Sequence, residues 1–160
     1  MDASPKQAAG SPVGAIARRT PFRMLTHSIA NDWSLVVEDE FVRKIIDGEV
    51  MLHMPGRTIY CSVYQTNNAT AEDAIQKMIE GRPGIPVQIF DREEPGLCGH
   101  GYLLPEIDNG NKYWGLNTWT AARGSVCCVT LYFQDFEDFN WAIGIWKSVR
   151  PRRDTNGRLN

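Results

Sequence analysis

At 160 residues, with 42% hydrophobic residues including five Trp, five Tyr and six Phe, the chain has the size and composition of one packed globular domain, which excludes a disordered or fibrous protein. Its net charge of −2 combines two basic ends with an acidic body, and such a body is a poor match for a phosphate backbone, so we expect no specific nucleic-acid binding. No stretch reaches the roughly 18 consecutive apolar residues that a membrane-spanning helix needs, so we expect no membrane span.

Composition divides the chain into three parts. We interpret residues 1–24 as a flexible basic N-terminal arm, because Ala, Pro, Ser and Gly are scattered through them and four cationic side chains face a single aspartate. The short apolar run Val13–Ala17 falls short of a secretory signal. Residues 25–149 are expected to form a single α+β domain, and residues 150–160, with four arginines, a flexible basic tail.

The four cysteines form neither a CxxC pair nor a dense disulfide framework. Cys127 and Cys128 are adjacent, so in a strand their side chains point to opposite faces and a bridge between them would be strained. We therefore expect reduced, buried thiols and a cytoplasmic protein.

The first half of the body predicts a meander of strands. Residues 33–37 alternate in part and lead into the acidic run Glu38-Asp39-Glu40, which is typical of an exposed turn. Strands are expected over 41–46, 50–54 and 57–65, separated by the turn pairs Asp47-Gly48 and Pro55-Gly56.

A helix is predicted after this meander. Thr70 is placed as its N-cap with Asp73 three residues on, apolar residues follow at helical spacing, and Gly81 ends it. Residues 87–90 then predict a strand that ends in the charged loop 91–96.

Three strands follow, at about 98–104, 112–120 and 125–133, and their short links, 108–111 and 121–124, predict antiparallel neighbours. The sheet should therefore be largely antiparallel, with about six to seven strands. The last element is predicted as an amphipathic helix, Asp135 to about Val149, packed on this sheet. Its stripe of Phe136, Phe139, Ile143 and Trp146 is assigned to the core, with Ala142 and Val149 on the same side, while Trp141 is expected to face outward.

Aromatic residues lie on both faces of the predicted sheet. Either a helix covers one face and the aromatics fill the core beneath it, or one aromatic face is open and binds a protein or an apolar ligand. The aromatic residues in question are Tyr60, Tyr64, Tyr113, Trp114, Trp119 and Tyr132, and in the second case we expect Tyr60 and Tyr64 on the binding surface. Glu106 and Asp108 are among the carboxylates that crowd one end of the sheet, where solvated loop charges are the commonest interpretation.

No cluster of residue types forces one chemistry. The alternating pair Cys98 and His100 matches no standard metal spacing, the glycines 99 and 101 lack the order of a phosphate-binding loop, and no signature of a hydrolase or metalloprotease occurs. We expect no metal ion, no cofactor and no catalytic residue.

The order of elements, together with the stretches 33–37, 101–105 and 139–148, resembles the PsbP-like superfamily and its bacterial DcrB-like relatives over about residues 33–149. The resemblance implies the fold described above and, because members of the superfamily are mostly accessory or binding proteins, a non-enzymatic role by analogy. It brings no shared catalytic set. The chain departs from the exported members in lacking a secretion or lipoprotein signal.

We therefore expect a non-enzymatic bacterial accessory or binding protein that acts through protein–protein interaction. A specific version is an immunity protein whose acidic segments face a basic toxin. The residues expected to bind are Glu38, Asp39, Glu40, Asp91, Glu93, Glu94, Tyr60, Tyr64 and Trp141. Two alternatives stay open: a small thiol-dependent hydrolase using Cys98 and His100, which requires a lowered thiol pKa, and a carrier of a small apolar ligand between sheet and helix.

Overall fold

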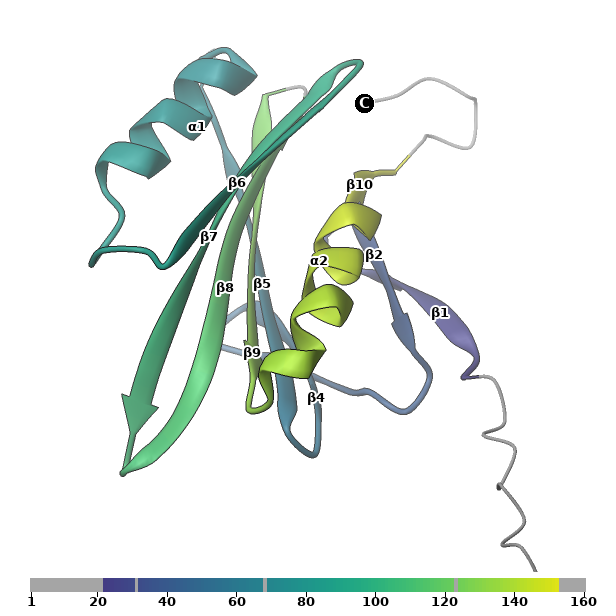
Figure 1. The fold of residues 1–160 in the computed structure, drawn as a ribbon. Helices are drawn as coiled ribbons and strands as arrows, with labels where there is room; N and C mark the ends of the chain where they lie inside the picture. Colours follow the sequence, from purple (N-terminus) through teal and green to yellow (C-terminus); the bar gives the residue numbers. More distant parts are fainter. Residues whose placement is uncertain (1–21, 31, 68, 123, 153–160) are drawn as a thin grey trace, which may run out of the picture.

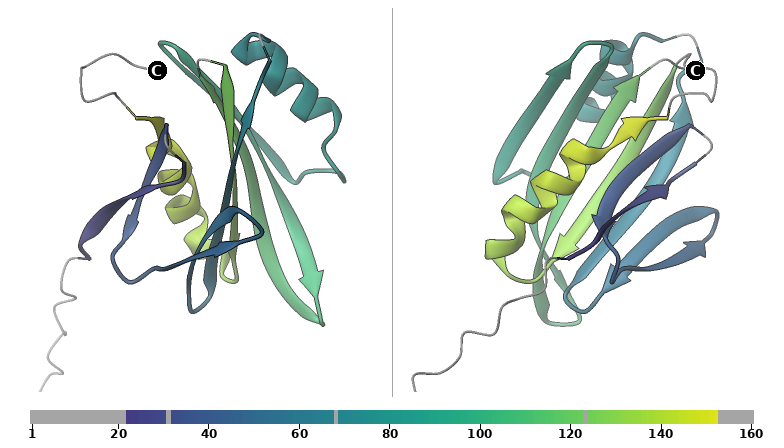
Figure 2. Two further views of the ribbon diagram at one scale, coloured as in Figure 1. Left: turned by 180° about the vertical axis from the view of Figure 1, so that it is seen from behind. Right: turned by 90° about the vertical axis from the view of Figure 1, so that its right-hand side faces the viewer.

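The computed structural model describes residues 22–30, 32–67, 69–122 and 124–152, and these build three layers (Figure 1). The middle layer is a seven-stranded antiparallel sheet, whose strands from edge to edge are β3 (Val42–Ile46), β4 (Glu49–Met54), β5 (Arg57–Gln65), β9 (Ser125–Phe133), β8 (Asn111–Ala122), β7 (Leu97–Asp108) and β6 (Gln88–Glu94). One face carries helix α1 (Ala71–Glu80). The opposite face carries helix α2 (Phe139–Ser148), the short 3-10 helix η1 (Phe136–Asp138) before it, and a small antiparallel sheet of β1 (Met24–Ser28), β2 (Trp33–Glu38) and β10 (Arg150–Pro151) (Figure 2).

The predicted fold class is confirmed, and several elements form for the reasons that their sequences give. The predicted bounds of β5 and β9 agree with the structure, because in both strands side chains alternate between the core and the opposite face. The side chain of Thr70 accepts a hydrogen bond from the amide of Asp73 at 3.1 Å and so caps α1 as predicted. Asp47 and Gly48 both have positive φ, which suits the tight turn between β3 and β4.

The strand at residues 33–37 does not begin the meander as predicted. It forms β2 in the small sheet, where it pairs with β1 on one side and with β10 on the other. Arg150 and Pro151, expected in the tail, thus contribute a short strand, and a proline fits there because β10 lies at the edge of its sheet. The expected arm and the rest of the expected tail lie, apart from a few residues, outside the described part of the chain.

The charged segment after Phe90 is strand rather than loop, so that prediction was wrong. Asp91 to Glu94 continue β6 and pair with β7. The side chain of Arg92 points inward and is buried, while its neighbours Asp91 and Glu93 are exposed on the opposite face. Inward and outward side chains therefore alternate along β6 as in other strands. The hydrophobic pattern does not show this alternation, because the buried residue is an arginine.

The buried side chain of Arg92 forms hydrogen bonds with the C-terminal end of α2. Its guanidinium donates to the carbonyl oxygens of Trp146 at 2.9 Å and of Lys147 and Val149 at 3.2 Å, and its Nε lies 2.7 Å from a carboxylate oxygen of Glu94. The last carbonyl groups of a helix have no hydrogen-bond donors within the helix, so the guanidinium of Arg92 supplies these donors.

The last helix begins later than predicted. The expected first turn is η1, Asp135 makes no capping hydrogen bond through its side chain, and Phe136 is 52% exposed instead of buried. The residues of α2 that are buried are Ala142, Ile145 and Trp146. The side of the helix that meets the core is therefore rotated in part from the predicted one. Trp146, Ala142 and Val149 are buried as predicted, whereas Phe139 and Ile143 are only partly buried.

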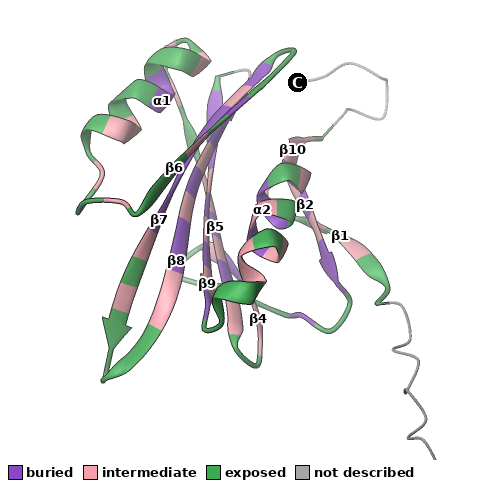
Figure 3. Cartoon of the chain, in the orientation of Figure 1, coloured by how far each residue is buried: buried purple, intermediate pink, exposed green. Residues whose placement is uncertain are grey.

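The main core lies between the large sheet and the layer formed by α2 and β2, as the burial in Figure 3 shows. Trp33, Leu35 and Val37 of β2 are each fully buried there. Trp146 lies flat against β7, where a Cβ on Gly101 would stand 3.4 Å from its ring, and its Nε1 donates to Thr120 Oγ1 at 3.0 Å. None of the described helices is long and apolar enough to cross a membrane.

Candidate functional site

The large sheet leaves part of one face uncovered. Helix α1 lies over one end of that face, where Ala74 and Ile75 pack on Ala121 and Val126 (Figures 1 and 2). Further along the same strands no helix or strand of the described residues lies above the sheet, and the side chains there are partly exposed. We call this uncovered part the tyrosine face and define it by Thr58, Tyr60, Glu106, Tyr113, Thr130 and Tyr132.

Strand alternation places these residues together. Ile59 and Leu131 point into the core, so Tyr60 and Tyr132 point the other way. Tyr60 stands opposite Thr130 across the β5–β9 pair, and Glu106 stands opposite Tyr113 across the β7–β8 pair. Four strands therefore contribute to one surface.

Two pairs of tyrosine rings meet edge to face on this surface. The ring centroids of Tyr60 and Tyr132 are 6.1 Å apart with planes at 77°, and those of Tyr113 and Tyr132 are 5.4 Å apart at 81°. A hollow of about 690 Å³ opens beside them, lined by the three rings and by polar residues that include Thr58, Thr130 and Glu49. Arg57 also lines the hollow, but its guanidinium is paired with Asp138. A volume of this size accommodates several side chains of a partner.

Gly115 lets the carboxylate of Glu106 lie on the sheet. A Cβ at position 115 would collide with Glu106 Oε1 and would stand 3.2 Å from Cε1 of Tyr132. Any larger residue would therefore push the carboxylate away from the rings. Among the described residues, no Lys, Arg or His forms an ion pair with Glu106.

The negative charge of Glu106 affects the pKa of the neighbouring tyrosine hydroxyls. Burial, and then the negative charge of Glu106, raise the pKa of Tyr132 to about 12. Burial, the charges of Glu106 and Asp108, and the hydrogen bond of its hydroxyl with Glu106 also raise the pKa of Tyr113. The face thus combines neutral phenol groups with an uncompensated carboxylate, which favours cationic or hydrogen-bonding groups of a partner.

Glu38 is held within the molecule, although the sequence placed it in an exposed acidic turn. It ends β2, is 9% exposed, accepts a hydrogen bond from Trp141 Nε1 at 3.2 Å and lies 3.6 Å from the guanidinium of Arg57. Arg57 also pairs with Asp138. Asp39 and Glu40, which follow Glu38, are exposed.

Trp141 is half-buried instead of facing outward. Its ring stacks on Phe41 at 6.0 Å, and the guanidinium of Arg57 lies over it at 4.6 Å from the centroid. Trp141 closes one end of the core on the α2 side of the large sheet, so it does not join Tyr60 on one surface.

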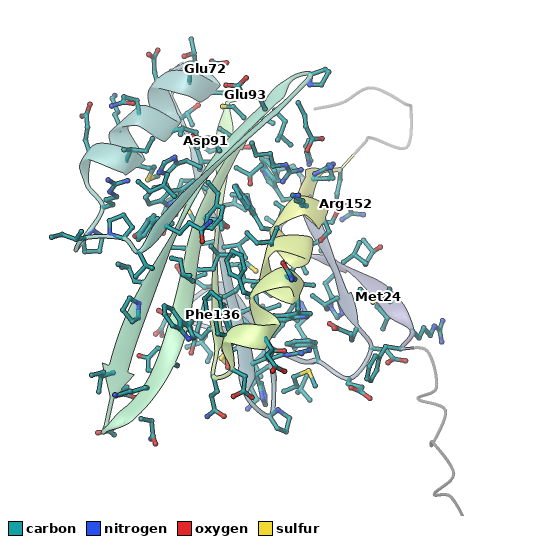
Figure 4. All side chains as sticks on the ribbon, in the orientation of Figure 1. Met24, Glu72, Asp91, Glu93, Phe136 and Arg152 are labelled. Carbon is teal, nitrogen blue, oxygen red and sulfur yellow. The ribbon has the colours of Figure 1, made fainter. Side chains whose placement is uncertain are left out.

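The acidic residues of β6 are partly engaged. The Nδ1 of His100 lies 2.7 Å from a carboxylate oxygen of Asp91, and Glu94 pairs with both Arg92 and Arg150. Glu93 is exposed, and Figure 4 shows it near Glu72 of α1 and away from Phe136. These carboxylates therefore do not combine with Glu38 to Glu40 into one acidic surface.

Cys98 and His100 share a face of β7, but the surroundings do not activate the thiol. Burial, Glu72 and Glu93 raise the pKa of Cys98, whereas a nucleophilic cysteine needs a lowered pKa. His100 is 4% exposed and stacks on Trp119 at 6.0 Å. In the described part of the chain, no three His, Cys, Asp or Glu side chains are grouped closely enough to hold a metal ion.

The carrier alternative requires a space between the sheet and a helix. Under α1 a hollow of about 310 Å³ is lined by residues that include Tyr64, Ala74 and Met78. On the opposite face the space between the sheet and α2 is largely filled by Trp146. A smaller hollow of about 270 Å³ lies between β6 and α2 beside Phe90 and Phe139, whose rings are 5.4 Å apart. Its volume falls below the usual range for small-molecule sites, about 300–1,000 Å³.

The sequence predicts that Tyr60 and Tyr64 share one face of their strand, which binds a partner if it is open. In the structure Tyr60 lies on the tyrosine face, and Tyr64 borders α1 and is 50% exposed. Sequence reasoning did not assign Glu106, Tyr113 and Tyr132 to a common site. The alternation within β8 and β9 shows which side chains of each strand share a face. Which side chains of the two strands are neighbours depends on the strand register, and the register depends on which residues form the turn between them.

No protein-family model and no curated protein sequence matches this chain. Solved structures do. A protein from Bacteroides thetaiotaomicron VPI-5482 is 10% identical with a TM-score of 0.62, over 76% of this chain and 46% of that one, so this chain spans about half its length. Cyanobacterial PsbP (CyanoP) from Synechocystis sp. PCC 6803 is 11% identical with a TM-score of 0.59, over 89% of this chain and 100% of that one.

The Saccharomyces cerevisiae Ran-binding protein Mog1p is 8% identical with a TM-score of 0.51, over 81% of this chain and 95% of that one. Identities this low concern the arrangement of the elements and not the residues of the site. The element order and these likenesses together give the chain a PsbP-like fold.

Proposed function

We propose that this chain is a non-enzymatic bacterial accessory protein that holds a protein partner on its tyrosine face. The observation that carries the proposal is the open half of a sheet face on which three tyrosine rings surround a hollow of about 690 Å³. Tyrosine combines a large apolar ring with a polar hydroxyl and is enriched at protein interfaces. That one structure of this fold is named for binding Ran supports a protein partner.

The chemistry of the cysteines supports a binding role over the thiol-hydrolase alternative and agrees with a cytoplasmic location. All four are free, and burial raises the pKa of each. Thiols of this kind behave as small apolar side chains.

A toxin-neutralising role is a narrower form of the same proposal. It would depend on Asp39, Glu40 and Glu93, which are exposed, because Glu38, Asp91 and Glu94 already have partners within the chain. Replacing Asp39, Glu40 and Glu93 by their amides should then slow association with a basic toxin and reduce its dependence on salt. Unchanged association rates would contradict this form.

The wider proposal is tested by site-specific cross-linking. A photoreactive phenylalanine analogue at Tyr64, beside the tyrosine face, should capture one protein from a native lysate, and the same analogue at the exposed Lys147 on α2 is the matched control. The captured protein is then purified, and its affinity is measured by calorimetry.

Tyr60→Ala should weaken that complex by about tenfold or more, as expected for an aromatic residue at the centre of an interface, while Lys147→Ala should leave it unchanged. Capture from both positions alike, or an unchanged affinity for Tyr60→Ala, would contradict the proposal.

A further inference from the structure

The carboxylate of Glu106 is the most unusual charge on the tyrosine face. It is half-buried, it lies against Gly115 and the ring of Tyr132, and no cation of the described residues pairs with it. A carboxylate that is partly shielded from water and has no cation beside it attracts a cationic group more strongly than a fully solvated carboxylate does.

The rings beside Glu106 add a second attraction for a cation. Tyr113 and Tyr132 stand at 81° with centroids 5.4 Å apart, so together they form an aromatic corner next to the carboxylate. The face of an aromatic ring attracts a cation through its quadrupole. Glu49 lines the hollow beside this corner, and it also lacks an ion-pair partner among the described residues.

We propose that Glu106, Tyr113 and Tyr132 bind the guanidinium group of an arginine exposed on the protein partner, an inference that rests on the proposed function and names the group that the tyrosine face recognises. A guanidinium is flat, so it stacks on a ring while its fork of N–H groups donates to a carboxylate; a compact ammonium can approach the ring and the carboxylate, but it has neither the plane nor the fork.

The chain already binds one of its own arginines in this way. On the other side of the sheet the guanidinium of Arg57 lies 4.6 Å from the ring centroid of Trp141 and donates from Nε to a carboxylate oxygen of Asp138 at 3.0 Å. At the tyrosine face the carboxylate and the rings are present, and the guanidinium has to come from another molecule.

The test uses the full chain and three blocked tripeptides, Gly-Arg-Gly, Gly-Lys-Gly and Gly-citrulline-Gly, followed by amide NMR spectra. Citrulline keeps the shape of arginine and removes its charge. The arginine peptide should shift the amide signals of β8 and β9 around Gly115 and Thr130, the lysine peptide should bind more weakly, and the citrulline peptide should leave the spectrum unchanged.

Glu106→Gln keeps the shape of the side chain and should weaken arginine binding by about tenfold, because it removes a charge-assisted hydrogen bond. Tyr113→Phe keeps the ring and removes the hydroxyl that hydrogen-bonds Glu106, so it should bind arginine at least as well as the unmodified chain, while Tyr113→Leu should lose about threefold. Amide spectra that are unchanged away from β7 and β8 establish that each variant is folded.

Equal shifts with the citrulline or lysine peptide, or full binding by Glu106→Gln, would overturn the inference. Its failure is distinguishable from failure of the proposed function. If no arginine peptide binds but Tyr60→Ala still weakens the protein complex, the arginine inference is wrong and the proposed function stands. If the arginine peptide binds as expected while Tyr60→Ala leaves the complex unchanged, the partner docks elsewhere and the proposed function is wrong.

Discussion

Replacing Trp146 by Ala should remove about 3–5 kcal/mol of stability, the usual cost of truncating a buried aromatic side chain to Ala. Trp146 is 2% exposed, and its ring contacts the backbone of β7 at positions that only glycine leaves free: a Cβ on Gly99 would stand 3.3 Å from it. The surrounding strands belong to a hydrogen-bonded sheet and cannot collapse into the vacated space, so the upper part of that range applies.

The free energy of unfolding is measured by urea denaturation followed by far-ultraviolet circular dichroism, since the tryptophan fluorescence itself changes. Trp146→Phe separates the two contributions, because it keeps an aromatic ring and removes the hydrogen bond to Thr120; it should cost about 1–3 kcal/mol. Phe136→Ala is the matched control at a 52% exposed position of η1 and should cost less than about 1 kcal/mol. A loss for Trp146→Ala no larger than that for Phe136→Ala would refute the assignment of Trp146 to the core.

Three further predictions concern titratable groups. Spectrophotometric titration should show one tyrosine ionising near pH 12, assigned to Tyr132, and Glu106→Gln should move that pKa down because it removes a negative charge; an unmoved titration would contradict the placement of Glu106. Native protein should react with iodoacetamide more slowly than a free thiol at all four cysteines, and a fast-labelling cysteine would revive the thiol-enzyme alternative. The hydrogen bond from Arg57 lowers the pKa of Asp138 below its ordinary 3.8, so its contribution to stability is complete above that pH and is lost as the pH falls through the lowered value. Acid unfolding of Asp138→Asn should show a shallower decline over that range, and identical curves would contradict the pairing.

The fold was predictable where local chemistry and tertiary packing agree. In β5 and β9 the alternation of core and surface side chains marks the whole strand, and at Thr70 the capping residue marks the start of α1. Prediction failed where a charged or cyclic residue occupies a strand: Arg92 is buried because the end of α2 supplies acceptors for it, and Pro151 pairs because it lies at a sheet edge. Neither the acceptors at the end of α2 nor the edge position of β10 can be inferred from the residues next to Arg92 or Pro151 in the sequence.

The candidate site was predictable only in part, for a related reason. Tyr60 could be assigned to a partly exposed face because core and surface side chains alternate regularly along β5. Glu106 belongs to the site only because Gly115, on the neighbouring strand, leaves space above the backbone. A glycine inside a strand carries no sign of which side chain will use its space, so this relation emerges only from the register of β7 against β8.

The pairing of β10 with β2 bears on how the domain is completed during synthesis. The amide of Val36 donates to Ser148 Oγ across 112 positions of sequence, and β10 follows directly after that serine. A ribosome can deliver every strand of the large sheet while β2 still lacks β10 and the helix α2, which lies beside it in the same layer. The part of the sheet that Trp146 and Ile145 cover therefore stays exposed until α2 emerges, and it is the surface of the nascent domain that a chaperone would meet.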